Sequence, residues 1–329
     1  MGELFNKILS SDESIFLNPQ FLDYDYQPKL VPFREIQQQQ VATCIKPLLN
    51  RRNGKNIIIV GRPGIGKTVS LKHVLNELKE DYGDEVFCLY VNGWKRDTSF
   101  KIISEICQQV GYKWTHNKNF DELMQAAAEI INEKSIVIVL DEADKLQDHN
   151  IIYNILEDLH RRCIILITND NNFITKIDNR IRSRLIPELI EFKPYNLQQT
   201  EEILKQRSEY AFVPNCLDKE AFDLVVKKTF EAGDLRLGLF LLKQSGELAE
   251  NASSRKITKE FVEKAFNSSS GFDLEKENDL ELLTKIIKEN SNKNKNELFK
   301  MYEIKEGKSY RTFQRKINDL EKSGKIKIL

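Results

Sequence analysis

Residues Gly61 to Thr68 form the feature that most limits what this chain can fold into. The octet reads Gly-Arg-Pro-Gly-Ile-Gly-Lys-Thr and fits the pattern G-x-x-x-x-G-K-[ST]. Asn56 to Val60 before it is an apolar, β-branched run typical of a buried strand, and the spacing from Val69 to Leu78 predicts a helix. Strand, glycine-rich turn and helix in this order predict a phosphate-binding loop, because backbone N–H groups and the positive helix end face the turn. An ordinary glycine-rich turn is the alternative, and the flanking elements argue against it.

Individual positions of this loop have distinct expected roles. Lys67 is expected to reach the β- and γ-phosphates of a nucleotide, and the Thr68 hydroxyl is expected to ligate Mg²⁺. Contacts to the nucleotide are expected from the whole run and the residue after it, which are Gly61, Arg62, Pro63, Gly64, Ile65, Gly66, Lys67, Thr68 and Val69.

Composition limits the class of protein. A chain of 329 residues with 40% hydrophobic and 30% charged residues predicts a globular protein of two or three domains. Because the formal net charge is zero, any nucleic-acid binding must depend on a local basic patch. The five cysteines and four histidines lack metal-ligand spacing, so neither a zinc site nor a disulfide framework is predicted. We expect no signal peptide, no membrane span and no membrane partner, which predicts a cytoplasmic location.

Short apolar segments separated by helical patterns predict a parallel sheet covered on both faces, an α/β fold. These segments are Ile57 to Val60, Val86 to Val91, Ile136 to Leu140, Ile164 to Thr168 and Leu189 to Phe192. The stretch Ile36 to Leu49 predicts a helix beside the loop. After Pro194 only amphipathic helical stretches follow, which predict a small all-helical domain from Leu197 to Tyr210, Lys219 to Thr229, Leu235 to Ala249 and Thr258 to Phe266.

Two predicted strands end in side chains that suit phosphate chemistry. The run Ile136 to Leu140 leads into Asp141 and Glu142. If this strand lies beside the strand of the loop, Asp141 would hold the Mg²⁺ hydration shell and Glu142 could polarise an attacking water. Asn169, after another strand, could orient that water, although an asparagine at a strand end is also a common turn former.

Arginines outside these strands are further candidates. Arg180, Arg182 and Arg184 occupy alternating positions of one short segment. One of them could neutralise the phosphate charge of a nucleotide bound to a neighbouring subunit, since a guanidinium binds phosphate bidentately. A solvated basic turn is the alternative for at least one of them. Arg236 opens a predicted helix after Gly233 and could reach the γ-phosphate, or could simply be exposed.

These elements in this order resemble AAA+ ATPases, and more narrowly the archaeal initiator family related to origin recognition complex subunit one and cell division control protein six. The resemblance covers nearly the whole chain and rests on the motifs above. It also rests on Ile15-Phe16, Tyr26 to Glu35, Tyr90-Val91-Asn92, Asp97 to Phe100, Leu140 to Asp144, Ile167 to Asp170, Asn179 to Arg184, Phe192 to Tyr195 and Gly233 to Arg236.

The resemblance implies three domains: an AAA+ nucleotide-binding sheet domain (1–194), a helical lid (195–268) and a C-terminal winged helix (272–329). It implies ATP or ADP with Mg²⁺ as ligands. It also implies Asn169 as sensor one, Arg236 as sensor two, and an arginine finger at Arg184 or, next, Arg182. The segment from Gly93 to Phe120 resembles the initiator-specific segment, which touches DNA in this family. Implied partners are origin duplex DNA, the replicative helicase and other initiator subunits, with a location at the nucleoid.

The C-terminal residues predict a basic helix independently of the family. Tyr310, Phe313, Ile317 and Leu320 form an apolar stripe, and residues 305–329 contain eight basic and three acidic residues. Such a helix suits insertion into a major groove, and the expected DNA contacts are Arg311, Thr312, Arg315 and Lys316. A solvated Lys-rich terminus is the alternative. Lys325 to Leu329 looks like the first strand of a wing, so a short wing is expected.

Other functions share some of these motifs. The run Asp141-Glu142-Ala143-Asp144 is spelled as in DEAD-box helicases, but the other helicase motifs are not visible in the sequence. A signalling NTPase switch whose winged helix contacts protein, a clamp-loader subunit and a nucleotide-locked binding protein remain alternatives to a slowly hydrolysing replication initiator.

Overall fold

The structure is a computed structural model that describes residues 14–268 and separate positions beyond them, namely Leu283, Ile286, Ile287, Lys295, Glu297, Leu298, Phe299, Tyr302, Tyr310, Phe313, Gln314 and Ile317. The chain forms two compact units, Met1–Ala265 and Phe266–Leu329, and each is described by itself. Within the described residues, no helix is both long and apolar enough to span a bilayer.

The first unit contains a five-stranded parallel sheet, as the apolar segments predict. Its strands are β1 (Ile57–Val60), β2 (Val86–Asn92), β3 (Ser135–Asp141), β4 (Arg162–Thr168) and β5 (Glu188–Glu191). They lie in the order β2-β3-β4-β1-β5, and all paired strands are parallel. Strand β4 therefore lies between β3 and β1. Asp141 and Glu142 follow β3, which is not adjacent to β1, the strand that leads into the phosphate-binding loop.

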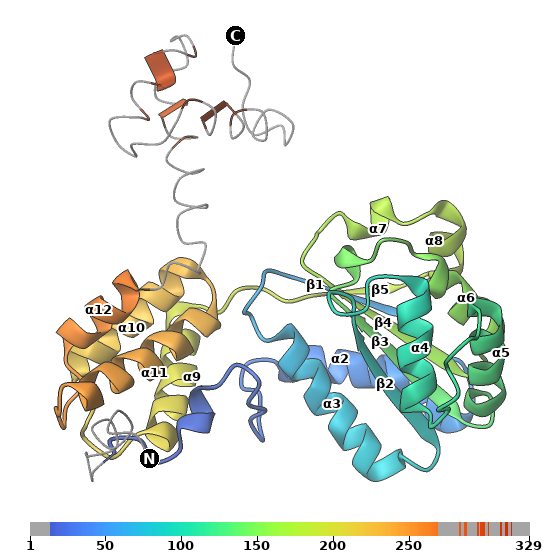
Figure 1. The fold of residues 1–329 in the computed structure, drawn as a ribbon, viewed down its shortest axis with the longest axis horizontal. Coiled ribbons are helices and arrows are strands. Elements are labelled where there is room, and N and C mark those ends of the chain that lie inside the picture. The colour runs from blue at the N-terminus through green and yellow to red at the C-terminus, as the bar shows by residue number, and fades with distance from the viewer. Residues whose placement is uncertain are drawn as a thin grey trace. The chain divides into compact units, whose positions relative to one another are not determined.

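Apolar residues fill both faces of this sheet, which is why its strands read as continuous hydrophobic runs. Ile58 and Val60 face one core with α4 (Ser99–Gln109), α5 (Phe120–Ile131), α6 (Asn150–Asp158), α7 (Phe173–Lys176) and α8 (Asn179–Leu185). Ile57 and Ile59 face the other core, with α2 (Glu35–Ile45) and α3 (Lys67–Tyr82). Figure 1 shows these two helical layers on opposite sides of the sheet.

The helix predicted from Ile36 to Leu49 is shorter than expected. α2 ends at Ile45, and a 3₁₀ helix, η2 (Lys46–Asn50), completes the segment. Pro47 lies in the first turn of η2, and because proline has no N–H it cannot continue the α-helical hydrogen bonding.

The lid consists of the four predicted helices, α9 (Leu197–Ala211), α10 (Lys219–Ala232), α11 (Leu235–Asn251) and α12 (Lys259–Asn267). Asn196 caps α9 with a capping box, and Asp234 caps α11. Gly233, at φ +66°, ends α10 in the left-handed conformation that favours glycine.

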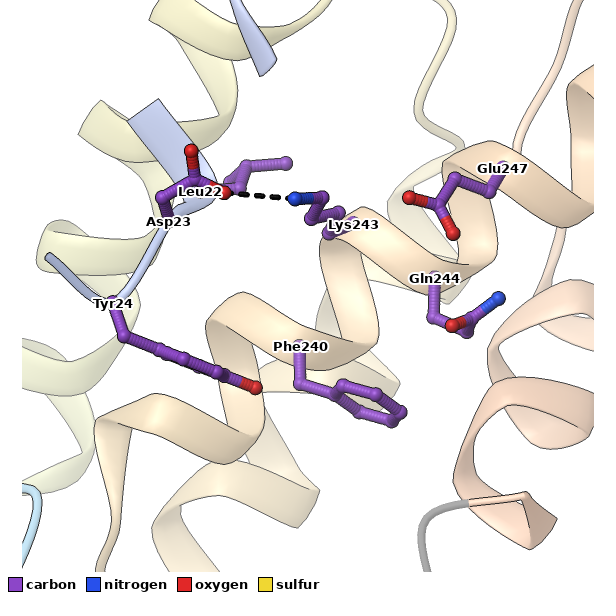
Figure 2. Close-up of a pocket in the computed structure, with 7 residues that line it drawn as sticks. All are labelled: Leu22, Asp23, Tyr24, Phe240, Lys243, Gln244 and Glu247. Carbon is purple, nitrogen blue, oxygen red and sulfur yellow. Dashed lines mark hydrogen bonds and ion pairs between the residues drawn. The ribbon is translucent and has the colours of Figure 1, made fainter. Parts of the chain in front are cut away.

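The N-terminal segment of the described chain packs on the lid. Phe16 forms a β-bridge with Phe212, the N–H of Leu17 donates to the Ala211 carbonyl at 2.8 Å, and the 3₁₀ helix η1 (Pro19–Leu22) contacts α9 and α11. Figure 2 shows Asp23 paired with Lys243 of α11 at 2.8 Å, beside a pocket of about 310 Å³. The predicted domain boundary at residue 194 stays a prediction.

The described residues of the second unit form a small apolar core. Leu283, Leu298, Tyr302, Phe313 and Ile317 are buried in it. Phe313 and Ile317 belong to the predicted apolar stripe, while Tyr310 is 38% exposed and Leu320 lies outside the described residues. The expected wing, Lys325 to Leu329, also lies outside them.

Candidate nucleotide-binding site

The loop between β1 and α3 has the backbone that a phosphate-binding loop requires. Gly64 and Gly66 adopt φ angles of +71° and +87°, in the left-handed region, and Gly66 precedes the first residue of α3. The neighbours also approach closely: a Cβ on Gly64 would lie 1.7 Å from Asp234 Oδ1, and one on Gly66 would lie 2.8 Å from the Tyr195 hydroxyl. Glycine is thus required twice here, by conformation and by space.

Lys67 is a buried cation inside this loop. It is the first residue of α3 and is 7% exposed. Its Nζ donates to the carbonyl oxygens of Gly61 (2.6 Å) and Arg62 (2.7 Å) and to Asn169 Oδ1 (2.8 Å). All three acceptors are neutral, and burial lowers the pKa of Lys67 to about 8. A buried ammonium held only by neutral oxygens at a helix N-terminus is the donor set that an anionic phosphate fits.

Thr68 and Asp141 meet although their strands are not adjacent. The Thr68 hydroxyl donates to Asp141 Oδ2 at 2.8 Å, because the first turn of α3 reaches past the end of β4 to β3. The same oxygen accepts a hydrogen bond from the Tyr90 hydroxyl. One hydroxyl and one carboxylate are hard oxygen ligands of the kind Mg²⁺ takes, with phosphate oxygens and water completing its shell. The described residues include no cluster of three or more His, Cys, Asp or Glu suited to a metal.

Glu142 has a strained backbone. Its φ is +53°, an uncommon value for a residue other than glycine that is often found where a side chain is aimed at a functional site. Burial, followed by the charges of Asp141 and Asp144, raises the pKa of Glu142 above its ordinary value. The carboxylate is therefore a stronger base than an exposed glutamate.

Asn169 is held from both sides. Its side-chain oxygen accepts the Lys67 bond, and its backbone N–H donates to Asp144 Oδ1 at 3.2 Å. Asp144 also accepts a 3.0 Å bond from the Thr168 hydroxyl. Asp144 thus links the end of β3 to the end of β4 and fixes the loop that carries Asn169.

The lid reaches the same loop through the N-terminus of α11. The backbone N–H of Leu235 donates to the Gly64 carbonyl at 3.2 Å. Arg236 is paired with Asp234 at 2.6 Å, and its charge acts on both Lys67 and Glu142. The candidate sensor-two arginine is therefore at the loop and is bound to an aspartate.

The three arginines of α8 have local partners. Arg180 pairs with Asp178 at 3.4 Å, and Arg182 donates to the Asn179 side chain. Arg184 forms an ion pair with Glu157 of α6, and its guanidinium lies 4.9 Å from the Tyr153 ring centroid.

Three residues at the site have no assigned role in the sequence patterns. Arg34 is 4% exposed and donates to the Ile65 and Lys193 carbonyls at 2.9 and 2.7 Å and to the Tyr195 hydroxyl at 3.0 Å. Tyr90 contacts Asp141, and Asp144 holds the Asn169 loop. Arg34, Tyr90 and Asp144 each lie in a segment that carries the family resemblance, which was the available signal. The expected DNA contacts Arg311, Thr312, Arg315 and Lys316 lie outside the described residues.

Comparisons with known proteins identify the domains and relatives of this chain. A family model described as an AAA domain matches residues 50–175, and one described as a Cdc6 AAA+ ATPase-type lid domain matches residues 201–267. The chain is 34% identical over 286 residues to the ORC1-type DNA replication protein of Pyrococcus furiosus, covering 80% of this chain and 67% of that protein. It is 30% identical over 336 residues to the ORC1-type DNA replication protein 2 of Methanosarcina acetivorans, covering 96% and 89%.

A solved structure extends this similarity to the fold. The Aeropyrum pernix ORC1 protein in complex with DNA matches with a TM-score of 0.71 and 25% sequence identity, covering 95% of this chain and 89% of that chain. The parallel sheet with its Cdc6-type lid thus confirms the α/β AAA+ fold predicted above. The chain belongs to the ORC1-type DNA replication protein family of AAA+ ATPases.

Proposed function

We propose that this chain is a DNA replication initiator that binds ATP with Mg²⁺, binds duplex DNA of a replication origin and helps to load the replicative helicase. It would act in the cytoplasm at the nucleoid, together with other initiator subunits. The observation that carries the proposal is that Lys67 and the N-terminus of α11 both contact the loop Gly61–Gly66, while Asn169 accepts a hydrogen bond from Lys67. Membership of the ORC1-type family supports the general role.

In this proposal the loop residues Gly61–Val69 bind the phosphates of ATP or ADP. The Lys67 ammonium exchanges its neutral acceptors for phosphate oxygens, which relieves the cost of burying an unneutralised charge. Thr68 and Asp141 would hold Mg²⁺, which supplies charge neutralisation at the phosphate oxygens when bound. Arg236 would bind the γ-phosphate after leaving Asp234, so that the lid responds to the nucleotide.

Hydrolysis in this proposal is slow and acts as a switch. Glu142 takes a proton from the attacking water, which its raised pKa favours, and Asn169 orients that water. Arg184, or Arg182, supplies the finger to a neighbouring subunit. A subunit without that neighbour lacks the finger, so its bound nucleotide persists.

The nucleotide part is tested by Glu142→Gln, measured by binding of a fluorescent ATP analogue and by single-turnover hydrolysis. We expect retained binding and hydrolysis slowed by about 10²-fold, the contribution of a general base. Unchanged turnover would remove Glu142 from the reaction and favour a nucleotide-locked binding protein.

The DNA part is tested by fluorescence anisotropy on origin-type duplexes from the host. Arg315→Ala with Lys316→Ala should weaken binding and lower the slope of log K against log salt by about 2, because two phosphate contacts are lost. The matched control is Lys219→Ala with Lys227→Ala, which removes the same charge from exposed positions of α10. Equal effects of both pairs would contradict a binding helix at the C-terminus, and absent DNA binding at physiological salt would favour the signalling NTPase switch.

A further inference from the structure

Three donors hold the carboxylate of Asp141. Its Oδ1 accepts from the backbone N–H of Glu142 at 2.8 Å, and its Oδ2 accepts from the hydroxyls of Thr68, at 2.8 Å, and Tyr90. Thr68 and Glu142 belong to the two nucleotide motifs of the sequence. Tyr90 comes from β2, the strand beside β3, and belongs to neither motif.

Tyr90 is itself fixed in place by neighbouring helices. Because β2 is an edge strand of the sheet, its outward backbone groups pair with no other strand among the described residues. The Gln109 side chain of α4 binds both of these groups at Tyr90: Nε2 donates to the carbonyl at 2.8 Å, and Oε1 accepts from the N–H at 3.1 Å. On the α3 side, the Lys72 ammonium lies 5.1 Å from the centre of the Tyr90 ring. The hydroxyl is therefore presented to Asp141 by a constrained side chain.

This arrangement restricts the orientation of the Asp141 carboxylate. A carboxylate offers about four acceptor positions, and three are used here, so one remains. Mg²⁺ demands near-ideal octahedral geometry, so a carboxylate in its shell must have a fixed orientation. Residues that orient a metal-binding carboxylate from outside the shell change metal affinity by about 10- to 100-fold when mutated.

We propose that Tyr90 is a positioning residue for the magnesium side of the nucleotide site, where its hydroxyl fixes the Asp141 carboxylate in the orientation that a Mg²⁺–nucleotide complex needs. The inference rests on the proposed nucleotide site and adds a residue that acts through Asp141. Tyr90 then makes two distinct contributions. Its ring packs against the core on the α3 face of the sheet, and its hydroxyl orients the Asp141 carboxylate for the metal.

Tyr90→Phe separates these contributions, because it removes the hydroxyl and keeps the ring. Binding of a fluorescent ATP analogue is measured first in EDTA and then across a titration with Mg²⁺. We expect the affinity in EDTA to match that of the unmodified protein, and the Mg²⁺ concentration for half-maximal enhancement of binding to rise about tenfold. Tyr112→Phe, which removes a hydroxyl from a side chain packed on the opposite core, should leave both curves unchanged.

Thr68→Ala serves as the positive control, since it removes a proposed ligand and should abolish the Mg²⁺ enhancement. A Tyr90→Phe titration that overlays that of the unmodified protein, while Thr68→Ala shifts, would overturn the positioning role. An equal loss of affinity in EDTA and in Mg²⁺ would also overturn it, because the effect would then be on the fold of the site. An unmodified protein that binds no nucleotide would refute the proposed function itself, and the Tyr90 inference with it.

Discussion

Arg34 connects the nucleotide loop to the junction between the sheet and the lid. Its guanidinium donates to the carbonyl of Ile65 in the loop and to the carbonyl of Lys193 and the hydroxyl of Tyr195 in the connection after β5. It also stacks on two rings, at 3.9 Å from the centre of the Tyr195 ring and 5.1 Å from that of Phe192. We expect Arg34→Ala to be strongly destabilising, because all these contacts are lost together.

The size of the effect follows from these contacts. Each buried acceptor left without its donor costs about 1 kcal/mol at the lower end of the usual range, and the ring contacts contribute about 1 kcal/mol. Arg34 is 4% exposed and its guanidinium is bound to neutral acceptors, so relief from burying this charge opposes the loss. We therefore expect a net loss of about 3 kcal/mol from the free energy of unfolding. Arg34→Lys should recover only part of it, since an ammonium lacks the planar fork and the stacking surface.

The assay is urea unfolding of the full chain followed by far-ultraviolet circular dichroism. Because the chain has more than one unit, the transition of Met1–Ala265 is fitted separately from that of the second unit. Arg52→Ala is the matched control, since Arg52 is exposed, and it should change the free energy of unfolding by less than about 0.5 kcal/mol.

A loss below about 1 kcal/mol for Arg34→Ala would refute this reasoning, because it would mean that water satisfies all three acceptors. Full recovery of stability in Arg34→Lys would separately contradict the role of the fork, since a lysine has neither the planar guanidinium nor its stacking surface.

Further predictions concern the loop and the proposed finger. Burial lowers the pKa of Lys67 from 10.5 to about 8, so between pH 8 and pH 10.5 the unfolded chain binds more protons than the folded one, and the stability of the nucleotide-free protein rises with pH. Lys67→Met should flatten this rise when the midpoint of urea unfolding is measured against pH. An identical slope for the variant and the unmodified protein would contradict the prediction. In Gly64→Ala the new Cβ would sit on a backbone with φ +71° and would lie 1.7 Å from Asp234 Oδ1, so the ATP affinity measured by calorimetry should fall by about tenfold or more. An unchanged affinity would show that Asp234 and α11 move aside without cost, which would contradict the prediction. Arg184→Ala should slow ATP hydrolysis in assembled samples by about 10³-fold, with recovery on mixing with Lys67→Met, whose Arg184 is intact; no recovery would argue against a finger acting between subunits.

The sequence predicted the parts of the site that depend on local patterns. Continuous β-branched runs identify strands buried on both faces, and the carboxyl ends of parallel strands lie at one edge of the sheet. Asp141, Asn169 and the loop before Lys67 follow three such runs, and the structure brings all three into one hydrogen-bonded group. The order of the strands was not predictable in this way, because nothing in the run before Asp141 indicates that β4 separates it from β1.

The contacts of Arg34 and Tyr90 could not be predicted from local sequence patterns for a different reason. Arg34 and Tyr195 are 161 positions apart, and Tyr90 and Asp141 are 51 apart, so neither pair leaves a periodic signal in the sequence. An isolated arginine or tyrosine has many possible partners, and only the folded backbone selects one. The packing of the N-terminal segment on the lid has the same origin, since it depends on single contacts such as Phe16 with Phe212.

The chain connects the lid and the sheet twice, and Arg34 binds the second of these connections. The chain first passes from the lid to the sheet domain between Tyr26 and Gln27. The Tyr26 ring lies 4.8 Å from the Arg207 guanidinium of α9, whereas the Gln27 side chain accepts a hydrogen bond from Asn76 of α3 at 2.9 Å. It passes back between β5 and α9, through the Lys193 carbonyl and the Tyr195 hydroxyl that Arg34 binds. A rotation of the lid must therefore bend both connections at once. Arg34 ties the second connection to the phosphate-binding loop through Ile65, and α11 binds the same loop through the N–H of Leu235 at Gly64, so any nucleotide that moves this loop would act on both the connection and α11.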